Sequence, residues 1–117
     1  MTFADVLAEV RGCQGVRLTA IADSDGIPVQ SWGGEKGECE ELIAEYSTFL
    51  REVATANREL QLGELEQIAM TAERRIVLIT RITGAYFLMT VVGRDGNAGK
   101  ARFASRTAAF RLRQEFV

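Results

Sequence analysis

Apolar and polar residues along this chain alternate between a helical period and a strand-like period, and each change of period predicts a new element. Residues 2–11 carry apolar side chains at helical spacing, and Thr2 is a candidate N-cap. The next segment, residues 16–32, has a strand-like run on each side of Asp25-Gly26, a pair that suits a hairpin turn. Because Pro28 cannot donate a ladder hydrogen bond, the second of these strands is expected at a sheet edge.

The longest helical pattern covers residues 38–61 and has two apolar stripes. The wider stripe follows a heptad spacing and comprises Leu42, Tyr46, Phe49, Val53, Ala56 and Leu60. A narrower stripe beside it comprises Ile43, Leu50 and Ala54, and Asn57 continues it. One stripe can cover a sheet, so the second must meet another surface or remain in water. We therefore expect this helix to have two packing partners.

Three strand-like runs follow, at residues 62–72, 75–82 and 85–92, and their short connections predict an antiparallel meander. The second and third runs are apolar on both faces and are expected at the centre of the sheet, whereas the first is more polar and is expected at its other edge. Residues 97–116 form the last helical pattern. The element order is helix, two strands, long helix, three strands, helix, in one α+β domain that spans residues 1–117.

The composition excludes several classes of function. A net charge of −2 and a pI near 5.2 argue against a nucleic-acid-binding protein. The chain has no histidine, and Cys13 and Cys39 stand alone, so no metal site is expected and both thiols are expected to be reduced. The acidic start is unlike a signal peptide, and no apolar run is long enough to span a membrane. We expect a cytoplasmic protein without membrane insertion and without a cofactor.

The stretch Gly93–Lys100, "GRDGNAGK", invites comparison with a phosphate-binding loop, whose form is G-x-x-x-x-G-K-[ST]. The required first glycine is Arg94, and Ala101 replaces the hydroxyl residue that would hold magnesium. The pattern instead favours a turn through Asp95-Gly96, with Asn97 as the cap of the last helix. Because a serine or cysteine nucleophile would also lack a histidine base, we assign no catalytic residue and expect a protein that is not an enzyme.

Charge is distributed unevenly along the chain. Residues 35–66 carry nine acidic side chains against three basic ones, whereas residues 67–117 carry nine basic side chains against three acidic ones. If the two helices of these halves lie on opposite faces of the sheet, the molecule has two differently charged surfaces. Such surfaces suit the steering of partners, although a solvated face without a partner would show the same pattern.

The element order resembles that of the roadblock/dynein light chain family, and in particular its small bacterial members of the MglB type. The segments that carry the likeness are the hairpin "GVRLTAIADSDGIPVQSWG", the segment "GELEQI" after the long helix and the entry "RDGNAGKAR" into the last helix. The resemblance implies the roadblock (profilin-like) fold. In that fold the long helix covers one face of a five-stranded antiparallel sheet, and the two terminal helices cover the other.

The resemblance also implies a homodimer, in which the long helix and the strand after it pair with their symmetry mates. The residues expected at this interface are Ile43, Leu50, Ala54, Leu62, Glu64, Glu66 and Ile68. Members of the family act as platforms for small Ras-like GTPases or as scaffold subunits. The MglB-type members resemble activators that reposition the GTPase's own catalytic groups without an arginine finger. The partner surface expected on the exposed side of the long helix comprises Glu41, Glu45, Glu52 and Glu59.

Two other functions remain open from the sequence. A small-molecule sensor of the PAS or GAF type would also place helices on a five-stranded sheet, but would keep a ligand pocket with inward polar groups. The mostly aliphatic central strands favour a filled core instead. A purely structural dimer within a larger complex cannot be separated from a GTPase regulator at this level.

Overall fold

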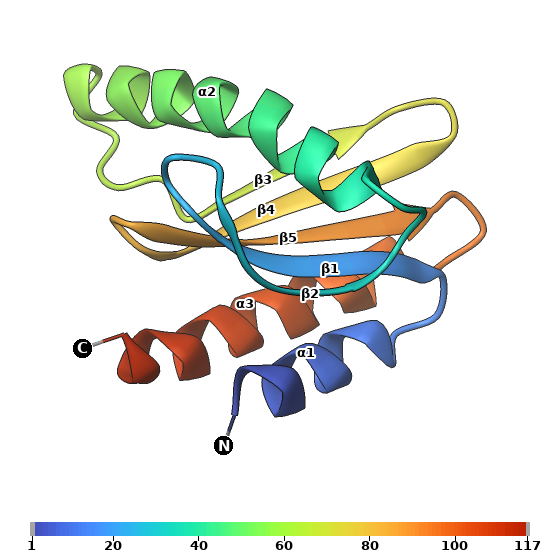
Figure 1. Cartoon of the computed structure of the whole chain (residues 1–117). Coiled ribbons are helices and arrows are strands. Elements are labelled where there is room, and N and C mark those ends of the chain that lie inside the picture. Colours follow the sequence, from blue (N-terminus) through green and yellow to red (C-terminus); the bar gives the residue numbers. More distant parts are fainter. Residues whose placement is uncertain (1, 117) are drawn as a thin grey trace.

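A five-stranded antiparallel sheet separates two helical layers in the computed structural model, which describes residues 2–116 (Figure 1). The elements are α1 (Phe3–Arg11), β1 (Val16–Asp23), β2 (Pro28–Gly33), α2 (Glu38–Glu59), β3 (Gln67–Thr71), β4 (Arg75–Thr83), β5 (Tyr86–Gly93) and α3 (Ala98–Glu115). The strands lie in the order β2-β1-β5-β4-β3, with α2 on one face and α1 and α3 on the other. The predicted element order, the antiparallel sheet and the distribution of helices are confirmed.

The central strands are apolar on both faces because each face meets a helical layer. Val77 and Met89 point toward α2, whereas Leu78 and Leu88 point toward α1 and α3. Every residue of β5 after Tyr86 is buried, as expected for the middle strand of the sheet. The strands β2 and β3 form the two edges, as their proline and their polarity predict.

Local signals fix the first hairpin and the starts of two helices. The Asp23 side chain accepts hydrogen bonds from the amides of Asp25 and Ile27, at 2.9 and 3.0 Å, and Gly26 has a left-handed φ of 88°. Thr2 caps α1, and its backbone and side chain both hydrogen-bond with Asp5, which lowers the pKa of that carboxyl. Asn97 caps α3 by accepting a hydrogen bond of 2.9 Å from the Lys100 amide. All three predictions are confirmed.

The segment after α2 differs from the prediction. The helix ends at Glu59 instead of Gln61, and the strand expected over residues 62–72 covers only Gln67–Thr71. Gln61 and Gly63 both have left-handed φ angles, and the Leu62 amide donates a hydrogen bond to the Asn57 carbonyl. The chain is therefore held against the end of the helix. It reaches the sheet at Glu66, whose carbonyl accepts a hydrogen bond of 2.8 Å from the Arg81 amide, just before β3 begins.

The orientation of α2 also corrects the expected division between its two apolar stripes. The buried residues of this helix are Cys39, Ile43 and Ser47, four residues apart, and Leu42, Tyr46 and Leu50 pack beside them against the sheet. The narrower stripe is thus turned toward the sheet. Phe49, Ala56 and Leu60 of the wider stripe are left exposed. Small side chains permit this orientation, because Ser47 lies against Gly26 of the first hairpin.

Candidate functional site

The segment Gly93–Lys100 forms a turn that leads into the capped start of α3. The Lys100 amide donates its hydrogen bond to the Asn97 side chain. This amide is one of the donors that an anion bound at the helix start would need. The backbone of Gly96 packs directly on Gly15, so the absence of a side chain at Gly96 allows two loops to cross closely. The structural interpretation of the motif is therefore favoured over a phosphate-binding loop.

The two thiols are buried and unpaired with each other. Burial, with a further contribution from Glu40, raises the pKa of the Cys39 thiol, so this group is neutral near pH 7. Among residues 2–116, no cluster of three or more potential side-chain ligands could hold a metal ion. Neither buried thiol has the exposed, electropositive setting of an activated nucleophile.

The four glutamates expected to face a partner lie together on the outer side of α2. Glu41, Glu45, Glu52 and Glu59 are all exposed. Their spacings of four, seven and seven residues place them within an arc of about 40°, opposite the buried Ile43. They form one line of negative charge, which we call the acidic stripe, along the solvent side of the helix.

A second surface combines the free edge of the sheet with one flank of α2. Within the described part of the chain, β3 pairs only with β4, so its other edge leaves backbone donors and acceptors unpaired. On the flank of α2 opposite the first hairpin lie Phe49 and Leu60, 39% and 68% exposed, followed by Leu62 at 68%. Leucines this exposed beside a free sheet edge are typical of a surface that meets another chain.

The residues expected at the dimer interface are not all placed on this surface. Ile43 is fully buried in the core of its own chain, so its expected role at the interface is revised. Leu50 and Ala54 are half-buried on the side of α2 that faces the sheet. Leu62, Glu66 and Ile68 remain accessible at or before the start of β3. Glu64 lies in the loop before β3 rather than on the strand, 4.0 Å from both Arg58 and Arg81 of its own chain.

The opposite face of the molecule is basic and carries two exposed aromatic rings. Arg102 and Arg106 are exposed on α3, together with Phe103 and Phe110, which are 71% and 62% exposed. With the acidic stripe on the other face of the sheet, this arrangement confirms the expectation of two differently charged surfaces. Among residues 2–116, no helix combines the length and the apolarity needed to cross a bilayer.

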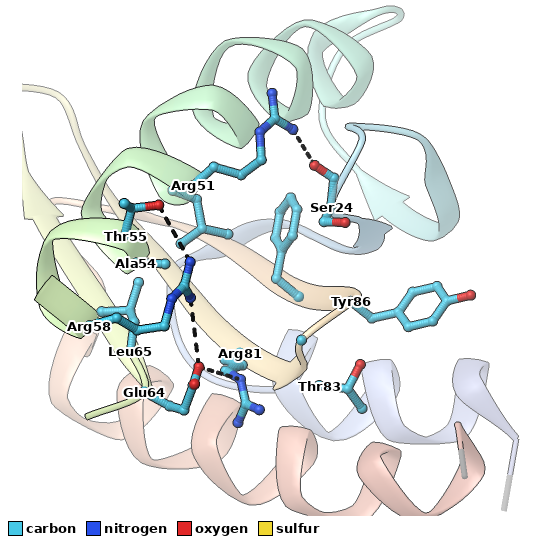
Figure 2. A pocket seen from close by; sticks show the side chains of 13 residues that line it. Ser24, Arg51, Ala54, Thr55, Arg58, Glu64, Leu65, Arg81, Thr83 and Tyr86 are labelled. Carbon is cyan, nitrogen blue, oxygen red and sulfur yellow. Dashed lines mark hydrogen bonds and ion pairs between the residues drawn. The ribbon is translucent and has the colours of Figure 1, made fainter.

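One feature of the site was missed at the sequence level. A cavity of about 280 Å³ lies under the C-terminal half of α2, and three arginines from two elements line it (Figure 2). Arg51 and Arg58 come from α2 and Arg81 comes from β4. Helical spacing places Arg51 and Arg58 on one face of α2, but only the packing of α2 on the sheet brings Arg81 to them.

Comparisons with known proteins agree with this geometry. The family model described as "Roadblock/LC7 domain" matches residues 2–93.

The structure of the gliding protein MglB from Thermus thermophilus is similar at 16% identity, with a TM-score of 0.85 over 96% of this chain and 86% of that one. A structure of MglB with a tetrameric arrangement gives the same identity and TM-score over 96% and 85%. Profilin II of Acanthamoeba castellanii is a more distant likeness, with 17% identity and a TM-score of 0.55 over 88% and 89%. No curated protein matches the sequence. Sequence identities of 16–17% to the solved structures establish the fold alone, and this fold is the expected roadblock (profilin-like) fold.

Proposed function

This chain belongs to the Roadblock/LC7 domain family, and from that premise we propose that it is a homodimeric, non-enzymatic regulator or scaffold that binds a small Ras-like GTPase. The observation that carries the proposal is the acidic stripe of Glu41, Glu45, Glu52 and Glu59, exposed along the outer side of α2. A line of like charge on a rigid helix is suited to steering and orienting a partner that carries the opposite charge.

The proposed dimer uses the surface formed by the β3 edge, Phe49, Leu60 and Leu62. A second copy would add its own β3 to the unpaired edge and would cover the exposed side chains on the flank of α2. Such a pairing is isologous, because each copy offers the same edge and the same flank. It would bring two acidic stripes to one side of a continuous sheet and so widen the platform for a partner.

A role in stimulating GTP hydrolysis would operate through the GTPase's own groups. Among the described residues, no arginine projects from the acidic stripe itself: Arg51 and Arg58 lie on the neighbouring side of α2, toward the cavity. We accordingly assign no arginine finger. Binding to the stripe would act by fixing the position of the partner's mobile segments, which is a mode of regulation through ordering.

The double charge reversal Glu45→Lys with Glu52→Lys tests the partner surface. Because it replaces attraction with repulsion at the centre of the stripe, we expect GTPase affinity to fall by about tenfold or more. The dimer should remain intact, since neither residue lies on the proposed dimer surface. Binding can be measured by biolayer interferometry and the dimer by analytical ultracentrifugation.

A matched control is the pair Glu73→Lys with Glu115→Lys, which makes the same change in net charge at exposed positions away from α2. This control should leave affinity nearly unchanged. Equal binding by the wild-type protein and the Glu45, Glu52 variant would remove the acidic stripe from the partner site. Equal losses in both variants would mean that net charge alone, and not this surface, governs binding.

A further inference from the structure

The cavity beneath α2 has the construction of a small ligand site. It lies between the C-terminal half of α2, the β1–β2 hairpin and the β4–β5 turn, and its volume of about 280 Å³ is near the lower limit for ligand pockets (Figure 2). Its apolar wall is formed by Leu50, Ala54, Leu65 and Phe87. A cavity of this size and lining accommodates one ring with a single polar substituent.

Its charged groups are unbalanced. Arg51, Arg58 and Arg81 line the cavity with only one carboxylate, that of Glu64, so the lining carries a net charge of about +2 at neutral pH. Arg51 is already engaged, because its guanidinium donates to the Ser24 carbonyl. Arg58 makes one long contact of 3.4 Å with the Thr55 hydroxyl and otherwise faces Glu64 (Figure 2).

The contacts of Glu64 leave this excess positive charge incompletely neutralised. Its carboxylate lies 4.0 Å from Nη1 of Arg58 and 4.0 Å from Nε of Arg81, which is beyond hydrogen-bond distance for both. The Nε atom of Arg81 is buried and donates no hydrogen bond to any residue between 2 and 116. A buried donor without an acceptor is unfavourable, so an acceptor supplied by a ligand would stabilise this arrangement.

We propose that this cavity binds a small phosphate monoester. Its phosphate lies between Arg58 and Arg81 in place of Glu64, and its apolar group covers Leu50, Ala54 and Phe87. A phosphate monoester carries close to two negative charges at neutral pH, which balances the two guanidinium groups of Arg58 and Arg81 once the carboxylate of Glu64 is displaced. Its oxygens accept two or more hydrogen bonds at once, and guanidinium groups provide the matching donors.

The inference does not rest on the proposed GTPase partner. The cavity opens on the flank of α2 that faces the β1–β2 hairpin, where Arg51 contacts Ser24, whereas the acidic stripe points outward from the same helix. Loss of ligand binding and loss of GTPase binding are therefore separable by different variants. A filled cavity would also tie the C-terminal half of α2 to the β4–β5 turn.

Phenyl phosphate is the probe for a first test, titrated into isotopically labelled full-length protein and followed by NMR and calorimetry. Inorganic phosphate, benzoate and benzyl alcohol are the comparison compounds. Phenyl phosphate should bind about tenfold or more tightly than each of them, because only it supplies both the dianion and the ring. The amides of Leu65 and Gly84, at the cavity wall, should shift on binding. Binding of benzoate that equals that of phenyl phosphate would overturn the assignment to a phosphate.

Variants of the charged lining separate this site from general anion binding. Arg58→Gln and Arg81→Gln should each raise the Kd for phenyl phosphate about tenfold. Glu64→Gln should lower it several-fold, because it removes the competing carboxylate; a damaged fold cannot produce such a gain. Arg74→Gln is the matched control, since this exposed arginine lies at the opposite end of β4.

The proposal is overturned if phenyl phosphate moves no amide at the cavity wall. It is equally overturned if the Kd is the same in the wild-type protein, Arg58→Gln and Glu64→Gln, or if Arg74→Gln weakens binding as much as Arg58→Gln does. If Arg81→Gln does not fold, Arg58→Gln and Glu64→Gln still decide the outcome, because both residues are exposed by more than half.

Discussion

At the scale of single residues, Gly15 and Gly96 are explained by a close crossing of two loops. A Cβ atom added to Gly15 would lie 2.4 Å from Cα of Gly96, and one added to Gly96 would lie 2.6 Å from the Gln14 carbonyl oxygen. The same crossing is fastened by backbone hydrogen bonds from Gly93 to Gly15, at 2.8 Å, and from Asn97 to Gln14, at 3.0 Å. The glycine-rich segment thus has a structural role in joining the α1–β1 and β5–α3 loops.

Gly15→Ala tests this role. Gly15 has a left-handed φ of 85°, and the added methyl group would meet backbone atoms that cannot move away. We expect the free energy of unfolding to fall by about 2 kcal/mol or more, measured by urea denaturation. Gly84→Ala is the control, because nothing lies within 4 Å of its added Cβ, and its cost should stay within about 0.5 kcal/mol. Equal stabilities of the two variants would contradict the proposed contribution of this loop crossing to stability.

At the scale of elements, the local caps and turns and the positions of the strands in the sheet were predictable from the sequence, whereas the start of β3 and the rotation of α2 were not. The caps at Thr2 and Asn97 and the hairpin turn at Gly26 depend on side chains within a few residues, so a short motif identifies them. Residues 62–65 were expected to begin the strand, but the Leu62 amide bonds to the Asn57 carbonyl at the end of α2, and backbone pairing with β4 starts only at Glu66. The pattern of a sequence cannot distinguish an extended loop from a paired strand.

The sequence pattern also failed to predict which side of α2 faces the sheet. Ser47 is buried beside Ile43 although it is polar, because its hydroxyl donates to the Ala44 carbonyl at 3.1 Å. A pattern that counts only apolar residues predicts that such a polar position is exposed to solvent. As a result Phe49 and Leu60, and not Ile43, form the exposed apolar flank of α2, which is the surface proposed for a second copy of the chain.

The double variant Phe49→Ser with Leu60→Ser tests this flank. Both side chains are exposed in the single chain, so their loss should change its stability by less than about 1 kcal/mol. The dimer, in contrast, should dissociate at least about tenfold more readily, because these side chains would be its buried anchors. Sedimentation equilibrium measures the association.

Phe103→Ser with Phe110→Ser supplies the control, because it removes two exposed apolar side chains, 71% and 62% exposed, from the opposite face. Dissociation of this control variant, with an intact dimer for the Phe49, Leu60 variant, would place the interface on α3 instead.

At the scale of the whole molecule, the sheet separates two surfaces of opposite charge. The acidic stripe on α2 and the arginines on α3 lie on different faces, as the uneven charge of the sequence predicts once the helices are placed (Figure 1). The arginine-lined cavity could not be predicted, because Arg51, Arg58 and Arg81 meet only through the packing of α2 on the sheet. Long-range charge is therefore visible in the sequence, whereas a site assembled from separate elements is not.

The measurement that tests the central proposal most directly is capture of a Ras-like GTPase on the immobilised protein from native lysate. The capture is performed in parallel with GDP and with a non-hydrolysable GTP analogue, and retained proteins are identified by mass spectrometry. We predict that a Ras-like GTPase is retained with the GTP analogue, released with GDP, and lost from the Glu45→Lys, Glu52→Lys variant. Retention of no GTPase with either nucleotide, or retention that ignores both the nucleotide and the charge reversal, would contradict a regulator that acts through the acidic stripe.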